Sequence, residues 1–344
     1  MAKLKRRPVK KPAPKRARKK GIGKGAKALA LFFGLALAAI VVWLVSSSIS
    51  NAVSAARTVP VDVDAEWGGE GDAPGQFKEP ECIAVDSAGN LYVSEFSGHR
   101  VQKFDPTGHA LLAIGHKGDG DGEFNQPSGI YVAPDGSIYV CDTFGKAQDS
   151  IGRIQKFDAQ GKFLKAWSHN FFGPRSIAGD GQNRLYVSDT GNHKIQVFDR
   201  DGNFLTQWGG MGTTEGKFRE PDGLTLDPQG NVFVADSDNL RIQKFDPNGK
   251  FLGSFKVSTW EGKNKELPYL AFSQGFLYAS NASQNAVLKY DPNGKLISIY
   301  KRKGDKAGFQ RAAGVALDGQ FHLFVVEWGN YKVARFTPPV MPLK

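Results

Sequence analysis

The segment LYVSDTGNHKIQVFD, residues 185–199, brings together three side chains that could do acid–base chemistry: Asp189, His193 and Lys194. A carboxylate close to an imidazole is an arrangement by which many enzymes move protons. The same residues also suit a polar turn, in which the aspartate accepts hydrogen bonds from nearby backbone amides. The two interpretations can be separated, because a structural turn recurs wherever the same element recurs.

Copies of this segment run through most of the chain. Its five-residue core recurs as LYVSE from Leu91, IYVCD from Ile138, LYVSD from Leu185, VFVAD from Val232, LYASN from Leu277 and LFVVE from Leu323. Successive copies start 47, 47, 47, 45 and 46 residues apart. A period of this length is typical of proteins built from copies of one supersecondary unit.

The repeat alignment favours the structural interpretation of the opening segment. The position of His193 is occupied in other copies by His99, Leu240, Asn285 and Tyr331. An acid followed five residues later by a base recurs in four copies: Glu95 with Arg100, Asp189 with Lys194, Asp236 with Arg241 and Glu327 with Lys332. We therefore predict that these polar residues build the repeat through a turn hydrogen bond or an ion pair.

Each copy has the pattern of four short strands. In the first copy these are IAVDS, LYVSE, RVQKFD and ALLAIG. Turns such as DPTGH, DRDGN and DPNGK join the third strand to the fourth, with Gly for positive φ and Asp for backbone hydrogen bonds. Strands that are apolar at consecutive positions indicate sheets covered on both faces. The sequence therefore predicts an all-β, six-bladed β-propeller over residues 59–339.

The two ends of the repeat region predict how the ring closes. The sixth copy stops at Pro338 and Pro339 without a fourth strand, whereas a spare segment, VDVDAEWGG at residues 61–69, precedes the first copy. Its Trp67 and the two following glycines match the Trp-Gly-Gly that ends the third copy. We expect residues 59–69 to complete the last blade as its outermost strand, which leaves no open seam.

These residues resemble the NHL-repeat family of β-propellers. The resemblance rests on G-x-F-x-x-P, an I-x-V-like strand, G-x-L/I-Y-V-x-D and R/K-I-Q-K-F-D-x-x-G, and it covers residues 60–338. It implies the fold. It implies no single function, because the family includes protein-binding, RNA-binding, sensor and enzyme members.

The positive charge of the chain is concentrated in its first residues. Of the formal net charge of +11, residues 1–27 supply thirteen Lys or Arg and no acid, which leaves 32 bases and 34 acids elsewhere. The proline- and lysine-rich tail is predicted to be disordered. Because the rest is near neutral, we expect no nucleic-acid partner for the propeller.

The segment after the tail predicts a membrane anchor. Ala28–Val45 holds eighteen uncharged, almost wholly apolar residues, which as a helix reach about 27 Å. We predict a signal-anchor span over 28–47, a linker over 48–58 and a C-terminal tail over 340–344. Bases beside a span stay inside, so the tail would contact anionic lipid headgroups and the propeller would be extracytoplasmic. A signal peptide cleaved near Ser54–Ala56 is the alternative.

Two cysteines fall at positions where other copies carry small residues. Cys82 aligns with Gly129, Ser176 and Gly223, and Cys141 aligns with Ser94, Ser188 and Ala235. This favours two small buried side chains. A disulfide between them is the alternative in an oxidising compartment.

The loop GDGDGEF, residues 118–124, has the alternating acids and glycines of a calcium loop. It aligns, however, with loops from Gly69 and Gly209 that lack those acids. We interpret all three as connections between blades.

Residues that break the repeat while facing the axis are the better candidates for recognition. The residue after the repeated proline opens the innermost strand at one mouth of the central channel. The copies place there Glu81, Ser128, Arg175, Asp222, Tyr269 and Ala313. We predict that the first five of these bind a ligand; a solvated mouth with mutually compensating charges is the alternative.

The same position bears on enzymatic resemblances. The chain is similar in fold to the peptidyl-hydroxyglycine amidating lyase, which implies a zinc held by histidines in P-H-x-L/I motifs. Here those motifs read PECI, PSGI, PRSI and PDGL, so the histidines are missing. Lactonases resembling gluconolactonase bind calcium through Glu, Asn and Asp, of which Glu81 and Asp222 are only part.

Two further irregularities suggest partner contacts. The second copy carries six extra residues between Asp142 and Arg153, and a surface extension on a rigid scaffold is a plausible contact loop. The residues predicted to make these contacts are Phe144, Lys146, Gln148, Asp149 and, in the long STWEGKNKELP connection, Trp260.

Together these features predict a non-enzymatic binding or scaffold module, without metal or cofactor, for a protein or glycan partner. A metal-dependent lyase or lactonase with its site at the channel mouth is the alternative.

Overall fold

The computed structural model of the chain describes residues 56–143, 152–260, 267–304 and 308–339. The chain divides into two units, Met1–Ala55 and Ala56–Lys344, and the described residues all belong to the second. The predicted basic tail and membrane span, residues 1–27 and 28–47, lie outside the described residues. Across the described ranges, no helix is long and apolar enough to cross a bilayer.

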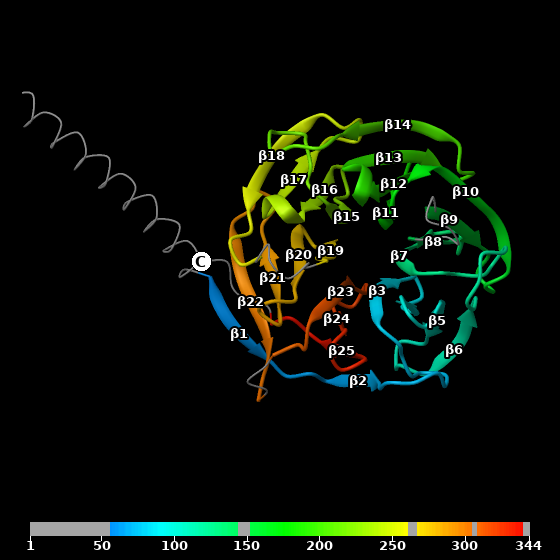
Figure 1. The fold of residues 1–344 in the computed structure, drawn as a ribbon. Coiled ribbons are helices and arrows are strands. Elements are labelled where there is room, and N and C mark those ends of the chain that lie inside the picture. Colours follow the sequence, from blue (N-terminus) through cyan, green and yellow to red (C-terminus); the bar gives the residue numbers. More distant parts are fainter. Residues whose placement is uncertain (1–55, 144–151, 261–266, 305–307, 340–344) are drawn as a thin grey trace, which may run out of the picture. The chain divides into compact units, whose positions relative to one another are not determined.

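Six sheets follow one another around a ring in the second unit, and each is one blade (Figure 1). The first blade contains β3 (Pro80–Val85), β4 (Leu91–Glu95), β5 (Arg100–Phe104) and β6 (Ala110–Ile114). The second contains β7 (Pro127–Val132), β8 (Ile138–Asp142), β9 (Gly152–Phe157) and β10 (Phe163–Phe171). The third contains β11 (Pro174–Gly179), β12 (Arg184–Asp189), β13 (Lys194–Asp199) and β14 (Phe204–Gly209).

The other three blades follow the same order. The fourth contains β15 (Pro221–Leu226), β16 (Val232–Asp236), β17 (Arg241–Phe245) and β18 (Phe251–Lys256). The fifth contains β19 (Leu270–Ser273), β20 (Phe276–Asn281), β21 (Ala286–Tyr290) and β22 (Leu296–Arg302). The sixth contains β23 (Ala312–Leu317), β24 (Leu323–Glu327) and β25 (Lys332–Phe336). Two short 3₁₀ helices, Thr190–Asn192 and Ser237–Asn239, follow the second strands of blades three and four. The predicted six-bladed, all-β architecture is therefore confirmed.

The apolar runs become strands because both faces of each sheet are covered by the neighbouring blades. All five residues of β4 and β8 are buried, as expected for sheets stacked face to face. One core cluster joins the first two blades through Tyr92, Ile114, Ile138 and Phe157. Turns follow the predicted chemistry: Asp105 Oδ1 accepts the backbone amides of Thr107 and His109, and Gly108 has a φ of +92°. Each blade is thus a locally specified unit that its neighbours complete.

The ring closes with a strand from the N-terminal side, as predicted. Strand β2 (Ala65–Gly68) pairs antiparallel with β25, and Trp67 lies opposite Val333. The extent of the closing segment was predicted wrongly, because the preceding strand β1 (Arg57–Val61) joins a different blade. It pairs in parallel with β22 of the fifth blade, so the N-terminal segment holds two neighbouring blades (Figure 1).

Both cysteines are buried free thiols. Cys82 is 6% exposed and Cys141 is fully buried. Burial raises the pKa of Cys82 to about 12 and also raises the pKa of Cys141. The interpretation of both as small buried residues is confirmed, and the disulfide alternative is not.

Candidate ligand pocket at the channel mouth

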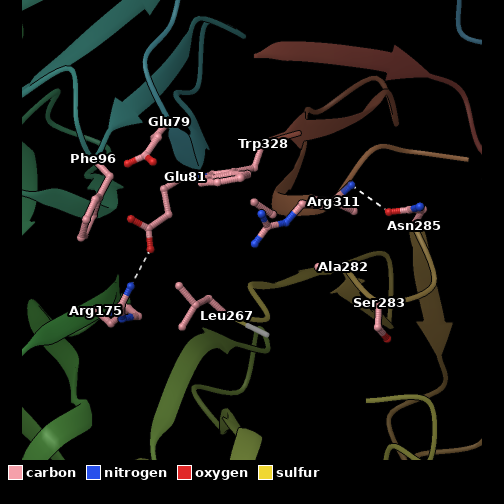
Figure 2. A pocket seen from close by; sticks show the side chains of 12 residues that line it. Glu79, Glu81, Phe96, Arg175, Leu267, Ala282, Ser283, Asn285, Arg311 and Trp328 are labelled. Carbon is pink, nitrogen blue, oxygen red and sulfur yellow. Dashed lines mark hydrogen bonds and ion pairs between the residues drawn. The ribbon is translucent and has the colours of Figure 1, made fainter. Parts of the chain in front are cut away.

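Three charged residues predicted at the channel mouth meet across the ring, although they come from three blades. Arg175 at the start of β11 places its Nη1 2.7 Å from Oε1 of Glu81 on β3, and Figure 2 shows this contact. Arg175 Nε is 3.8 Å from Oδ1 of Asp222 on β15. The exposed fractions of the three side chains are 15%, 5% and 2% in that order. One arginine therefore compensates two buried carboxylates.

Burial and charge pull the pKa values of this cluster in different directions. Burial raises the pKa of Asp222 to about 7, against the opposing effects of the Arg175 charge and the Ser237 hydroxyl. Burial alone would lower the pKa of Arg175, but the charges of Glu81 and Asp222 outweigh it and raise that pKa. Burial, followed by the charge of Glu81, raises the pKa of Tyr269. Arg175 stays charged at all relevant pH values, whereas Asp222 titrates near neutrality.

The other predicted mouth residues have different surroundings. Ser128 Oγ lies 2.9 Å from Thr143 Oγ1 and 3.3 Å from the carbonyl oxygen of Pro174, so its hydroxyl links blades two and three. Tyr269 is buried, and its hydroxyl has no hydrogen-bond partner among the described residues. Glu81 Oε2, Arg175 Nε and Asp222 Oδ1 also lack hydrogen-bond partners there. Unpaired buried polar atoms in such a group suit ordered water.

A pocket of about 760 Å³ opens beside this cluster. Of the five predicted residues, Glu81 and Arg175 line it, whereas Ser128, Asp222 and Tyr269 do not; Ala313, at the same repeat position in the sixth blade, lines it as well. Its remaining lining comes mainly from blades one, five and six and from the segments that lead into their innermost strands: Glu79, Phe96, Leu267, Ala282, Ser283, Asn285, Arg311, Ala312 and Trp328. Figure 2 shows the labelled side chains arranged around the pocket. Its volume falls in the range of small-molecule and short-peptide sites.

Sequence reasoning missed the two aromatic walls, Phe96 and Trp328, although the repeat contained a signal for them. Both follow directly after the residue that ends the second strand of a blade. The six copies place there Phe96, Thr143, Thr190, Ser237, Ala282 and Trp328. The large aromatic residues are departures from a position otherwise filled by small side chains, and both departures line the pocket.

Arg311 is another pocket residue that sequence reasoning missed. It precedes β23, has a left-handed φ of +53°, and its backbone amide donates to Asn285 Oδ1 at 2.8 Å. Its guanidinium carbon lies 3.9 Å from the centre of the Trp328 ring. A guanidinium stacked on an indole at this distance is held in place by a cation–π interaction.

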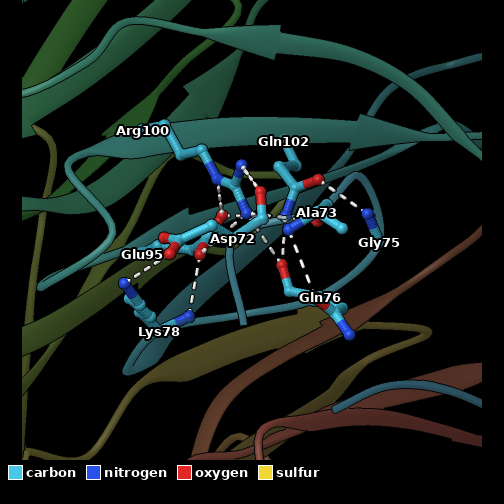
Figure 3. A network of polar contacts seen from close by, with 8 residues as sticks. All are labelled: Asp72, Ala73, Gly75, Gln76, Lys78, Glu95, Arg100 and Gln102. Carbon is cyan, nitrogen blue, oxygen red and sulfur yellow. Dashed lines mark hydrogen bonds and ion pairs between the residues drawn. The ribbon is translucent and has the colours of Figure 1, made fainter. Parts of the chain in front are cut away.

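The acid–base pairs of the repeat proved structural, as predicted. Glu95 Oε1 lies 2.6 Å from Arg100 Nε, Oε2 accepts the Lys78 amide, and Arg100 and Gln102 bind carbonyls of the loop before the blade (Figure 3). In the opening segment, Asp189 accepts the Phe172 amide at 2.7 Å and lies 3.7 Å from Lys194. In these copies the acid also accepts a backbone amide from the connection that leads into the blade, so the pair helps to fix that connection.

The fourth predicted pair departs from this pattern. Glu327 pairs with Arg302 at 3.2 Å, because Lys332 is drawn to Glu66 on the closing strand, 2.8 Å away. His193 is a turn residue with a φ of +56° whose Nδ1 accepts the Glu220 amide. The structural interpretation of the opening segment therefore holds.

The acidic loop at residues 118–124 is a connection between blades, as interpreted. Its Phe124 is fully buried, and Arg153 donates to the carbonyls of Asp119 and Glu123. Lys117 and Phe124 form an isolated bridge that recurs as Glu70 with Phe77 and Met211 with Phe218. The glycine-rich sequence thus follows a shared backbone geometry.

Trp260 differs from the expectation of a surface contact. It is only 2% exposed, packs in the core between blades four and five, and its Nε1 donates to the Ser280 carbonyl at 3.3 Å. The indole of Trp260 is buried because it packs against apolar side chains of blades four and five. The other predicted contact residues, Phe144, Lys146, Gln148 and Asp149, lie outside the described residues.

The donor set at the mouth does not fit a divalent metal. Arg175 lies between Glu81 and Asp222 and supplies the positive charge that a metal ion would otherwise bring to these carboxylates. In the described ranges, no group of three or more His, Cys, Asp or Glu side chains is placed to hold an ion. Glu81 and Asp222 are therefore only part of the calcium ligands that a lactonase would need, and both already contact the Arg175 guanidinium.

Comparisons with known proteins agree with this architecture. Residues 77–104 match the NHL repeat, and residues 117–261 match the SMP-30/Gluconolactonase/LRE-like region. The chain is a β-propeller protein. Virginiamycin B lyase from Staphylococcus aureus has a similar fold, with a TM-score of 0.55 and 16% identity over 80% of this chain and 95% of that one.

Two curated proteins match this propeller over part of its length. The B-box type zinc finger protein ncl-1 of Caenorhabditis elegans is 37% identical over 144 residues, which is 42% of this chain and 16% of that protein. The protein brain tumor of Drosophila melanogaster is 24% identical over 145 residues, which is 42% of this chain and 14% of that protein. The matched region thus spans less than a fifth of either relative.

Proposed function

We propose that this propeller is a non-enzymatic binding module that receives a protein partner at the pocketed end of its channel. The observation that carries the proposal is the position of the pocket, which is walled by the residues that depart from the repeat. Residues shared by all copies are used to build the ring, so the departures are available for recognition. Phe96 and Trp328 supply aromatic walls, and aromatic residues in pockets are common anchors of protein partners.

The partner is proposed to be a protein because the pocket combines aromatic, aliphatic and charged groups. Leu267, Ala282 and Ala312 add apolar surface to the aromatic walls, while Glu79 and Arg311 add groups of opposite charge. This mixture suits a peptide segment with both apolar and polar groups. A glycan is the alternative partner. It would stack on the aromatic rings and hydrogen-bond to the carboxylates, but it would leave the aliphatic wall largely without contacts.

We further propose that the module is held at the outer face of a membrane by the apolar segment Ala28–Val45. Support comes from the length of this uncharged run and from the thirteen basic residues that precede it. In this arrangement the basic tail contacts anionic lipid headgroups on the inner face. Protease protection of intact and permeabilised cells tests the orientation: a propeller degraded only after permeabilisation of the bounding membrane would contradict it.

An enzymatic role of the lyase or lactonase type gains no support from the mouth residues. A metal-assisted reaction needs carboxylates or imidazoles open to the ion, whereas Glu81 and Asp222 both face Arg175. The solved lyase with a similar fold shares 16% identity with this chain, which supports the fold alone.

A site-specific cross-linking experiment tests the binding proposal. A photoreactive phenylalanine analogue replaces Ser283 at the pocket rim in the full chain, expressed in its native cells. The matched control places the analogue at Gln320, an exposed residue in the β23–β24 turn at the opposite end of the strands. We expect a discrete cross-linked protein from position 283 that disappears when Ala282→Trp fills the pocket. Equal cross-linking from both positions, or insensitivity to the filled pocket, would contradict the proposal.

A further inference from the structure

The charges that line the pocket differ in whether they already have partners. Glu81 and Arg175 form an ion pair at 2.7 Å, and Arg175 also faces Asp222. Glu79 accepts a hydrogen bond from the Ser97 hydroxyl through Oε2. The guanidinium of Arg311, by contrast, has no ion pair or hydrogen bond with any residue in the described ranges. Of the two arginines that line the described part of the pocket, Arg311 is therefore the one whose guanidinium is available to a ligand.

Arg311 is nevertheless held in a defined position. Its backbone is fixed by the left-handed φ and by the hydrogen bond to Asn285, and its guanidinium lies on the Trp328 ring. Figure 2 shows the guanidinium turned into the pocket beside Trp328, on the side of Glu81 and Arg175. An exposed arginine without a partner usually samples many rotamers, so this stacking lowers the entropic cost of forming new hydrogen bonds.

A guanidinium with its donors free binds a planar carboxylate through two parallel hydrogen bonds. The surroundings restrict the anion further. Glu79 lines the same pocket, and its negative charge disfavours a dianion such as phosphate, whereas the charge of Glu81 is compensated by Arg175. Phe96 and Leu267 form an apolar part of the pocket wall, against which an apolar group attached to the carboxylate would pack. The free guanidinium, the carboxylate of Glu79 and the apolar wall together favour a monoanion with an apolar body.

We propose that Arg311, stacked on Trp328, binds the carboxylate of an organic ligand whose apolar body packs against Phe96 and Leu267. This inference rests on the proposed binding function and specifies its ligand. The C-terminal carboxylate of a peptide that ends in an apolar residue has this chemistry, and a few residues of peptide fit about 760 Å³. A free branched-chain carboxylic acid has the same chemistry and is the second source of it.

The test compares matched ligands that differ only in the carboxylate. The probes are an equimolar pool of N-acetyl tripeptides ending in leucine, isoleucine, valine or phenylalanine, and the same pool as C-terminal amides. Binding to the purified full-length chain is measured by ligand-observed NMR and by tryptophan fluorescence. We expect saturable binding of the acids and at least about tenfold weaker binding of the amides, the usual range for loss of a charge-assisted bidentate contact.

Variants assign the effect to Arg311. Arg311→Gln should reduce binding of the acids to the level of the amides, and Arg311→Lys should give an intermediate affinity because it keeps charge without the fork geometry. Arg219→Gln is the matched control, since Arg219 is an exposed arginine that precedes the innermost strand of blade four and does not line the pocket. It should bind the acids as the wild type does.

The outcomes separate this inference from the proposed function. Equal affinity for acids and amides, or no saturation of either pool below about 10 mM, a concentration at which even weak specific sites fill, overturns the carboxylate inference. If cross-linking at position 283 still depends on the pocket, the binding function then stands without it. Binding of 4-methylpentanoate as tight as that of the leucine peptide identifies a free acid as the ligand and overturns the peptide assignment.

Discussion

The two halves of the channel mouth use the same repeat position in opposite ways. In blades two to four, the residue after the second strand is Thr143, Thr190 or Ser237. Their hydroxyls bind the Pro174 carbonyl at 3.1 Å, the Pro221 carbonyl at 2.7 Å and the Asp222 carboxylate, respectively. In blades five, six and one, the same position holds Ala282, Trp328 and Phe96, and there the pocket opens. We refer to these as the tied half and the open half.

The comparison shows how one fold position can serve either construction or recognition. Each hydroxyl in the tied half donates a hydrogen bond to a buried carbonyl or carboxylate at the start of an innermost strand. For Thr143 and Thr190 that strand belongs to the next blade. An alanine or an aromatic ring cannot make that bond, and the space above the innermost strands is left for a ligand. Arg175 connects the halves, because it starts in blade three and reaches Glu81 in blade one.

The largest expected change in the free energy of unfolding comes from replacing Arg175, which links the two halves. Arg175→Met leaves Glu81 and Asp222 buried without their shared cation, and breaking a buried ion pair in this way costs about 3–5 kcal/mol. Urea unfolding at pH 8 measures the loss. Adding Glu81→Gln to Arg175→Met should recover part of it, since one uncompensated charge disappears. A loss below about 1 kcal/mol, the size of a surface pair, would show that the two halves are not coupled through Arg175.

The next effect is a pH dependence that originates in the tied half. Burial raises the pKa of Asp222 to about 7, above its ordinary value of 3.8. The folded state therefore holds this proton more tightly than the unfolded state. The stability gained is fully present below the unfolded pKa and is lost as pH rises through about 7.

Asp222→Asn tests this dependence. Relative to this variant, the wild type should lose about 2–4 kcal/mol of unfolding free energy between pH 4 and pH 8, since each unit of pKa shift corresponds to about 1.4 kcal/mol. Denaturant titrations across that range measure it, and the carboxyl ¹³C shift of Asp222 reports its pKa directly. Parallel pH profiles for wild type and variant would contradict the assignment.

A smaller effect distinguishes construction from recognition within the tied half. Thr190→Val keeps the shape of the side chain but removes the hydroxyl that donates to Pro221. We expect a loss of about 1 kcal/mol, the usual net value of one hydrogen bond, and no change in ligand binding. Trp328→Thr in the open half should show the reverse pattern, with weaker binding and a small change in stability. Equal effects of both variants on binding would contradict the claim that only the open half contacts the ligand.

The smallest effect concerns the two thiols, which should be inert in both halves. Cys82 and Cys141 are buried, and burial raises the pKa of each, so little thiolate is available. A thiol reagent at pH 8 should label neither residue in the native protein and both in urea. Rapid labelling of either thiol without denaturant would show that the blade interfaces open.

Most of the fold could be predicted because repeated positions share one physical role. Strand boundaries, the Asp–Gly turns, the acid–base pairs and the closing Trp67 strand all recur as patterns in the sequence. The parallel pairing of β1 with β22 could not be predicted, since RTVPV does not resemble any strand of the repeat. β1 lies next to β22 because it directly precedes the closing strand β2 in the chain. Trp260 was misassigned for a related reason: its connection has no counterpart in other copies.

The site could be predicted only in part. The alignment identified Glu81 and Arg175, because charged residues at an inward-facing position are conspicuous. Phe96 and Trp328 are visible as departures once the position after the second strand is also aligned. The role of Arg311 depends on its left-handed backbone and on the ring beside it, and neither follows from the residue types alone.

Cross-linking from equivalent positions in the two halves shows whether a partner contacts the open half alone. Ser283 in the open half and Asp238 in the tied half occupy the same place in the repeat, and both are exposed. With the photoreactive phenylalanine analogue at either position of the full chain in its native cells, we expect a discrete partner adduct from 283 and none from 238. An adduct of equal yield from 238 would contradict the claim that recognition belongs to the open half.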